Sequence, residues 1–299
     1  MTVKVAYYPG CVAQESGKEL DMATRAVAAA LGIELVDFPT FSCCGSGFID
    51  EANMTLNIAL NARNLALAER AGLNTVMTIC STCQGMLTHA RHTMKHDAVV
   101  KARVDQTLGK IGFQYQGTAV PKHLLQIISE DLGGAEMLRP LVRRPLTGTK
   151  VAAFYGCHIL RPHDVMKFDD PEEPHTFEDI IKVLGAEPVY YRGRVQCCGF
   201  PIQFVKPETA QRIAGNQIRE AKQGGADAMA TPCPLCHISL DTYQKEAGKA
   251  VGEDLNMPVL HFPQLIGIAL GLDPKTLGLP RHMVDPQLLL NKVSVSVPA

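Results

Sequence analysis

Ten cysteines are the residues of this sequence most able to do chemistry, and they form two sets of five. Each set has the same order: a single cysteine, an adjacent pair followed by glycine, and a CxxC. The spacings are C-x31-CC-x35-C-x2-C and C-x39-CC-x34-C-x2-C. The first set is Cys11, Cys43, Cys44, Cys80 and Cys83, and the second set is Cys157, Cys197, Cys198, Cys233 and Cys236. No cysteine is left over, so an internal duplication is the simplest explanation.

Five thiols exceed the needs of an ordinary metal site by one. A structural zinc ion takes four ligands in a tetrahedron, and adjacent cysteines fit that geometry poorly, so zinc stays open only for one half with a spare thiol. Disulfides would leave an odd cysteine in each half, and thioredoxin-like exchange would use the CxxC alone. Thiolates are the usual ligands of iron–sulfur clusters, which we therefore favour. A fifth thiolate could bridge two irons of an open, non-cubane cluster.

Composition limits the other classes of function. The chain has 299 residues, enough for two domains, and a formal net charge of −1 without a long basic run, which argues against a nucleic-acid partner. The N-terminal MTVKVAYYPGC has no signal-peptide pattern, and no apolar run reaches about 18 residues, so we expect no transmembrane segment and a cytoplasmic location. In a reducing compartment, ten cysteines indicate metal binding or redox chemistry.

Strand-like runs lead into the cysteines of both halves. "VAYYPG" and "VAAFYG" precede the first cysteine, "IELVDFP" and "PVYYRGRV" precede the pair, and "NTVMTIC" and "DAMATPC" end at the CxxC. Helical patterns between them cover residues 17–31, 53–71, 175–185 and 207–223. Alternating strands and helices predict parallel sheets, whose ligands lie beyond the carboxyl ends of the strands. Each set of five thiols is therefore expected at one edge of a sheet.

The predicted fold class is α/β, with two pseudo-symmetric domains, each a small parallel Rossmann-like sheet with flanking helices. The repeat extends past the cysteines, because "VPKHLLQII" matches "VLHFPQLIG" and pairs His123 with His261. The segment "RRPLTGTK", residues 143 to 150, combines proline, glycine and charge. We accordingly expect a first domain over residues 1–148 and a second over residues 149–299.

Two histidines directly follow cysteines of the second set, namely His158 and His237, whereas the first half has Val12 and Gln84 there. Histidine can supply protons near neutral pH, so both are candidate catalytic residues. The favoured alternative is a hydrogen bond that tunes the potential of a bound cluster.

The stretches "YYPGC…SCCGSG…CSTC" and "FYGCHILRP…QCCGF…CPLCH" resemble duplicated CCG-domain proteins over nearly the whole chain. The family in question is the B-type subunit of heterodisulfide reductase, and the motifs also resemble the E-type subunit of a type-E succinate dehydrogenase/fumarate reductase. The resemblance implies two non-cubane [4Fe-4S] clusters, one held by each set of five cysteines. All ten cysteines match the motif.

The resemblance also implies a function. We expect the iron–sulfur subunit of a heterodisulfide reductase-like complex, an oxidoreductase that performs two-electron chemistry on a disulfide, thiol or lipoyl substrate. The alternative is an electron relay to or from a quinone. Expected partners are a C-type subunit with cubane iron–sulfur clusters and a flavoprotein, which could hold the chain peripherally at a membrane.

The two functions predict different sites. Cleavage of a disulfide needs two electrons, so two clusters should face one substrate, and metal sites on opposite faces of the molecule would rule this out. A polar cavity open to water between the clusters favours a disulfide, whereas an apolar opening ringed by basic or aromatic groups favours a quinone.

Overall fold

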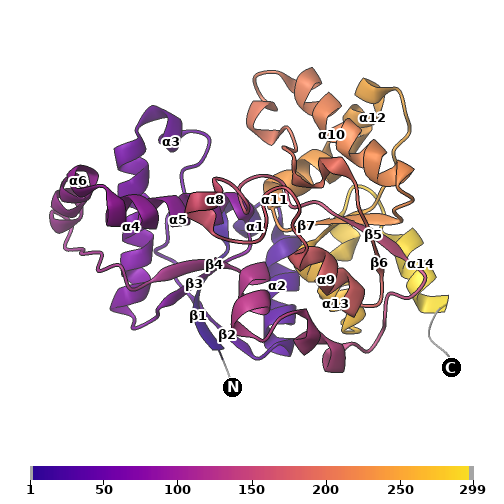
Figure 1. Ribbon diagram of the computed structural model, residues 1–299, viewed down its shortest axis with the longest axis horizontal. Coiled ribbons are helices and arrows are strands. Elements are labelled where there is room, and N and C mark those ends of the chain that lie inside the picture. Colours follow the sequence, from indigo (N-terminus) through magenta and orange to yellow (C-terminus); the bar gives the residue numbers. More distant parts are fainter. Residues whose placement is uncertain (1–2, 296–299) are drawn as a thin grey trace.

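The chain folds around two parallel four-stranded sheets, one in each half of the sequence (Figure 1). The computed structural model describes residues 3 to 295, and side chains through residue 293. The strand orders are β2-β1-β3-β4 and β6-β5-β7-β8, which are the same arrangement written twice. The predicted α/β class with two similar sheets and flanking helices is therefore confirmed.

The first sheet brings the carboxyl ends of its strands to the first cysteine set. Its strands are β1 (Val3–Tyr8), β2 (Ile33–Asp37), β3 (Thr75–Thr78) and β4 (Val120–His123). The helical segments of this half are α1 (Gly10–Gln14), α2 (Lys18–Ala30), α3 (Ile49–Ala52), α4 (Met54–Arg70), α5 (Ser81–His96), α6 (Ala98–Gly109), α7 (Leu124–Gln126), η1 (Ile127–Asp131) and η2 (Ala135–Leu141).

The second sheet repeats this plan. Its strands are β5 (Lys150–Ala153), β6 (Glu187–Val189), β7 (Ala228–Thr231) and β8 (Val259–His261). Its helical segments are α8 (His163–Met166), α9 (Thr176–Val183), η3 (Arg192–Val195), η4 (Phe200–Ile202), α10 (Pro207–Gln223), α11 (Pro234–His237), η5 (Ile238–Thr242), α12 (Gln244–Val251), α13 (Phe262–Ala269), η6 (Leu279–Arg281) and α14 (Gln287–Val295).

One predicted strand is shorter than expected. The run "PVYYRGRV" continues β6 only to Val189 and then forms the 3-10 turn η3. Two long-range contacts hold this turn: the Gly193 amide donates to Glu220 Oε2 at 2.8 Å, and Arg194 Nε donates to the buried Glu178 Oε1 at 3.1 Å. Tertiary contacts therefore override the β-branched and aromatic residues that favour a strand.

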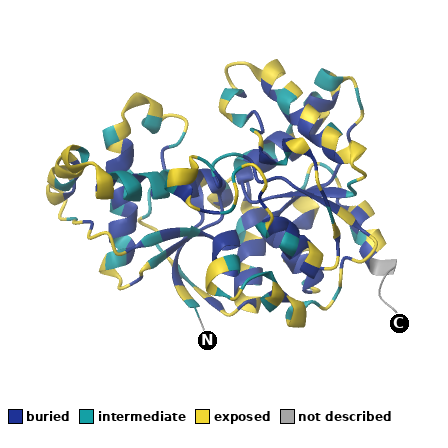
Figure 2. Cartoon of the chain, in the orientation of Figure 1, coloured by how far each residue is buried: buried dark blue, intermediate teal, exposed yellow. Residues whose placement is uncertain are grey.

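The two halves share their hydrophobic cores. One cluster of buried side chains joins Leu20 of α2 to Phe262 and Leu265 of α13, and α2 packs directly on α13 between the sheets (Figure 1). A second cluster includes buried cysteines of both sets. Figure 2 shows the strands buried at the centre of the molecule, with exposed residues on the outer helices. The domain boundary at residue 148 stays a prediction, because neither core belongs to one half alone.

Candidate redox centre

The first set of thiols gathers at the carboxyl edge of the first sheet. Cys11 lies in α1, the adjacent pair lies in the loop after β2, and the CxxC opens α5. Cys43 Sγ is 3.7 Å from Cys11 Sγ, and the Cys83 amide donates to Cys80 Sγ at 3.5 Å. Gly10 has a φ of +77°, and a Cβ there would lie 3.0 Å from Cys83 Sγ. Backbone free of a side chain therefore leaves room for the sulfurs.

The second set repeats this geometry. Gly156, which precedes Cys157, has a φ of +70°, and a Cβ there would lie 3.0 Å from Cys236 Sγ. The Gly199 amide donates to Cys197 Sγ at 3.4 Å, as the Gly45 amide does to the matching sulfur of the first set. All ten cysteines are described, and none of them forms a disulfide. Each cradle could therefore hold a metal cluster through five thiolates.

The two sets meet at the seam between the halves. Cys80 Sγ lies 3.9 Å from Cys233 Sγ, and Thr82 Oγ1 lies 3.6 Å from the same sulfur. His123 Nε2 is 2.9 Å from the carbonyl oxygen of Pro232, so the repeated histidine of the first half positions the second CxxC. The sites are adjacent and do not lie on opposite faces, as two-electron chemistry at a shared site requires.

Hydrogen bonds between neighbouring thiols give these thiols different pKa values. The hydrogen bond between Cys43 and Cys11 lowers the pKa of Cys43 to about 2, and the bond between Cys197 and Cys157 lowers the pKa of Cys197 to about 2. Within the first pair, the bond to Cys43 raises the pKa of Cys44 to about 12. The first member of each CC pair is therefore a thiolate in the metal-free chain, and the thiolate is the form that binds metal.

The loop that carries the first CC pair is held by asparagines that our sequence analysis missed. Asn57 and Asn61 of α4 donate through Nδ2 to the carbonyl oxygen of Cys44, at 2.8 and 3.0 Å. Asn64 donates to the carbonyl oxygen of Ser42 at 3.0 Å and accepts from its amide. All three asparagines are fully buried. Their spacing of four and three residues on one helix face was the available signal.

A pocket of about 240 Å³ opens at the seam and reaches the second set. Its lining includes all five cysteines of that set and Thr82, but no cysteine of the first set. Three phenylalanines lie in its wall: Phe48 from the loop after the first CC pair, and Phe200 and Phe204 from the segment after the second. Phe48 is 78% exposed and Phe204 is 73% exposed, so aromatic rings flank the mouth. The lining also has polar side chains, among them Asp50 and Glu51, so the pocket combines aromatic and polar walls.

The structure separates the two candidate histidines. His158 lines the seam pocket, and its Nδ1 is buried without a hydrogen-bond partner. His237 is buried on the other side of the second CxxC, where its ring stacks on His261 with centroids 3.8 Å apart and its Nε2 is 2.9 Å from the Val259 carbonyl oxygen. Of the two, His158 is placed to reach a substrate.

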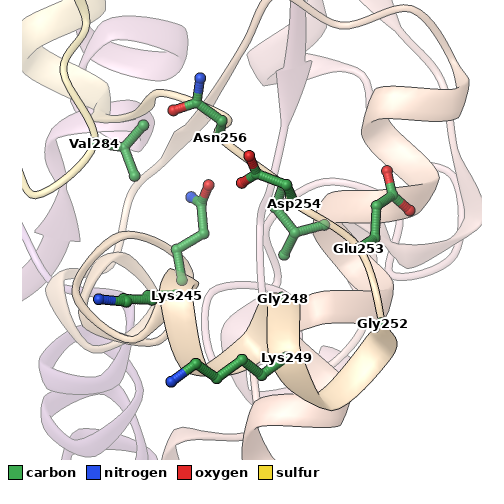
Figure 3. A pocket seen from close by; sticks show the side chains of 10 residues that line it. Lys245, Gly248, Lys249, Gly252, Glu253, Asp254, Asn256 and Val284 are labelled. Atoms are coloured by element: carbon green, nitrogen blue, oxygen red, sulfur yellow. The ribbon is translucent and has the colours of Figure 1, made fainter.

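A second cavity lies elsewhere and offers no comparable chemistry. It has a volume of about 480 Å³ and follows α12 and the segment after it. Figure 3 shows its lining, with Lys245 and Lys249 from the helix and Asp254 and Asn256 from the following segment. Its described lining contains neither cysteine nor histidine, so it is not part of the redox centre.

Two pseudo-symmetric α/β halves, each presenting five converging thiols, define a duplicated cysteine-rich protein of the iron–sulfur class. The family model "Cysteine-rich domain" (CCG) matches residues 5–88 and 151–241, and the chain belongs to this family. The resemblance to the B-type subunit of heterodisulfide reductase and to fumarate reductase subunits is thereby confirmed, and it places the chain among oxidoreductase subunits.

Two relatives match over nearly their whole length. The chain is 38% identical over 285 residues to the "8-methylmenaquinol:fumarate reductase membrane anchor subunit" of Wolinella succinogenes, covering 95% of this chain and 98% of the relative. It is 31% identical over 293 residues to the B-type subunit of the "Ferredoxin/F(420)H(2)-dependent CoB-CoM heterodisulfide reductase" of Methanosarcina acetivorans, covering 97% of both. Among the described residues, no helix is long and apolar enough to cross a membrane.

A solved structure shares the fold. A hypothetical protein from Helicobacter pylori superposes with a TM-score of 0.76 at 17% identity, over 94% of this chain and 52% of that one. At this identity the likeness concerns the fold alone.

Proposed function

We propose that this chain is the iron–sulfur subunit of a reductase complex and that its ten cysteines hold two non-cubane [4Fe-4S] clusters, one per set. The observation that carries the proposal is the 3.9 Å approach of Cys80 Sγ to Cys233 Sγ, which makes the two sites one centre. When bound, such clusters exchange electrons singly, and two of them supply the pair that a two-electron substrate needs. The glycine cradles beside Cys83 and Cys236 support ligation by the five thiolates of each set.

The two sets have different access to their surroundings. Cys11 and Cys43 of the first set are exposed at the surface, whereas the second set lines the seam pocket. We assign the first set to exchange with a partner protein, such as a C-type subunit with cubane clusters or a flavoprotein, and the second set to the substrate. The chain would then work on the cytoplasmic side and reach a membrane only through its partners.

The substrate that the pocket fits best is a quinone. Its aromatic wall suits a flat apolar ring, and its exposed Phe48 and Phe204 continue that wall to the surface. His158 has a buried Nδ1 without a partner, and it is the residue we expect to bind a quinone oxygen and to deliver or accept its proton. The relative from Wolinella succinogenes is named for a menaquinol, which agrees with this choice.

A disulfide is the second candidate. One observation favours it: Thr82, from the CxxC of the first half, reaches both the pocket and Cys233 Sγ, so a substrate sulfur there would lie beside both sets. The relative from Methanosarcina acetivorans is named for a heterodisulfide. In this case His158 would protonate a product thiolate.

The test is turnover by the cluster-loaded complex with two probes, a water-soluble menaquinol analogue and a small aliphatic disulfide. The double variant Phe48→Ser and Phe204→Ser should raise the KM for the quinol at least tenfold and leave the iron content unchanged. Ile111→Ser removes another exposed apolar side chain, one that does not line the pocket, and should change neither value. Disulfide turnover with no quinol turnover would select the second candidate, and no turnover of either with full iron content would refute both.

A further inference from the structure

A cluster of three histidines and two carboxylates lies behind the second CxxC, outside the seam pocket. Its members are Glu19 of α2, His237 and Asp241 after the CxxC, His261 at the end of β8, and His282 near the C-terminus. His237 Nε2 lies 3.3 Å from His282 Nδ1, and His261 Nε2 lies 3.5 Å from Glu19 Oε1. Four of the five residues are buried, which is costly for such polar groups unless they have partners.

His261 is the member whose polar atoms are not satisfied. It is 1% exposed, and neither Nδ1 nor Nε2 makes a hydrogen bond. Its counterpart in the first half, His123, is equally buried but has two partners: its Nδ1 accepts from the Leu125 amide at 3.0 Å, and its Nε2 bonds to Pro232. His261 Nδ1 lacks the equivalent partner because Pro263, at the position of Leu125, has no amide hydrogen. Its Nε2 faces Glu19 Oε1 at 3.5 Å, beyond the length of a good hydrogen bond.

We propose that Glu19, His237 and His261 bind a divalent ion of the zinc class, separate from the ten thiols. One potential ligand atom of each residue lies within 4.8 Å of the other two. Ligand atoms of a tetrahedral zinc ion at its usual bond lengths are about 3.4 Å apart. The 3.5 Å between His261 Nε2 and Glu19 Oε1 already has this value. Imidazole and carboxylate are ligands that such ions take in proteins.

The surrounding groups orient these ligands as metal sites require. His237 Nε2 faces the Val259 carbonyl oxygen at 2.9 Å and so carries the proton, which leaves Nδ1 with its lone pair. Arg281 Nε donates to Glu19 Oε2 at 3.1 Å, and Oε1 stays directed to His261. Asp241 is occupied by two amides of the segment after His282, Met283 and Val284, so it acts as a support and not as a ligand.

The same contacts place His282 outside the ligand set. Gln264 Oε1 lies 2.9 Å from His282 Nε2, and Gln264 Nε2 donates to the Leu277 carbonyl oxygen. The amide of Gln264 is therefore fixed, and His282 must carry its proton on Nε2. Its Nδ1 then faces the Nε2–H of His237 and keeps that ring in place.

The proposed ion would tie the halves together. Glu19 comes from the first half, whereas both histidines come from the second, on α11 and at the cap of α13. The site adjoins the seam where α2 packs on α13. Removal of the ion should therefore loosen the seam before it affects either sheet.

The test is metal analysis of the anaerobically purified, cluster-loaded chain by plasma mass spectrometry. We expect one equivalent of a non-iron divalent metal per chain, with zinc as the probe in the growth medium. Zinc-edge X-ray absorption of the same sample should show nitrogen and oxygen neighbours without sulfur. His261→Ala should lose the zinc and keep its iron, and so should Glu19→Gln, which preserves the shape of the side chain in case the first variant does not fold.

His123→Ala is the matched control, since it removes the equivalent histidine of the first half and should keep the zinc. The proposal is overturned if the native chain holds no zinc, if zinc persists in both Glu19→Gln and His261→Ala, or if its neighbours are sulfurs. Sulfur neighbours would mean that zinc occupies a cysteine set instead, which would contradict the proposed two-cluster function as well. Absence of zinc with full iron content would leave that function intact.

Discussion

Replacement of Gly10 by alanine tests the sulfur cradle of the first set. Gly10 has a φ of +77°, and a left-handed conformation costs a non-glycine residue about 1–2 kcal/mol, partly offset by about 0.4–1 kcal/mol of lost unfolded-state entropy. The net loss of stability from the backbone alone is therefore about 1 kcal/mol. The new Cβ would in addition lie 3.0 Å from Cys83 Sγ, where non-bonded atoms prefer about 3.5–4.0 Å.

The sulfur must then move by several tenths of an ångström, and metal sites tolerate about 0.2 Å. We expect Gly10→Ala to lose about half of the iron. Gly32→Ala is the matched control, because Gly32 has a φ of +72° with nothing near its Cβ position. It should lose about the same 1 kcal/mol in urea unfolding of the metal-free chain and keep its iron. Equal iron content in the two variants would refute the proposed role of Cys83 as a ligand.

Three further changes have defined outcomes. Asn57→Leu removes a 2.8 Å hydrogen bond to the loop of the first CC pair. It should lower the free energy of unfolding in urea by about 1–3 kcal/mol and also lower the iron content. Unchanged values would mean that this hydrogen bond does not hold the loop in place. In the metal-free chain, the lowered pKa of Cys43 and the raised pKa of Cys11 predict that iodoacetamide at pH 6 labels Cys43 first by mass spectrometry, and equal labelling would contradict this. Arg194→Leu leaves the buried Glu178 without its cation and should destabilise the chain by about 3–5 kcal/mol, a loss that a stable variant would disprove.

The fold was largely predictable because its signals are local and occur twice. Strand-like runs that end at cysteines, the helical patterns between them, and the repeat that pairs His123 with His261 indicated both parallel sheets. The segment after Val189 was not predictable, because its turn depends on Glu178 and Glu220, which lie far from it in the sequence.

The positions of the ten cysteines at the sheet edges were predictable, and their surroundings were less so. The repeated spacing identified all ten cysteines, and parallel-sheet topology placed them at the sheet edges. The contact between Cys80 and Cys233 depends on how the two halves pack, which no motif encodes. The packing of the two halves also decides where the candidate histidines lie. Both directly follow a cysteine, yet only His158 lines the pocket. The two candidates looked equivalent in the sequence.

Electron paramagnetic resonance of the anaerobically purified chain, with both sites reduced by one electron, tests the central claim most directly. Two clusters held through Cys80 and Cys233, whose Sγ atoms lie 3.9 Å apart, would interact magnetically, so we expect one broadened, split spectrum that integrates to two spins per chain. The sample should contain about eight iron atoms, as two [4Fe-4S] clusters require. A single unsplit signal from about four iron atoms, or two independent signals, would contradict a pair of adjacent clusters at the seam.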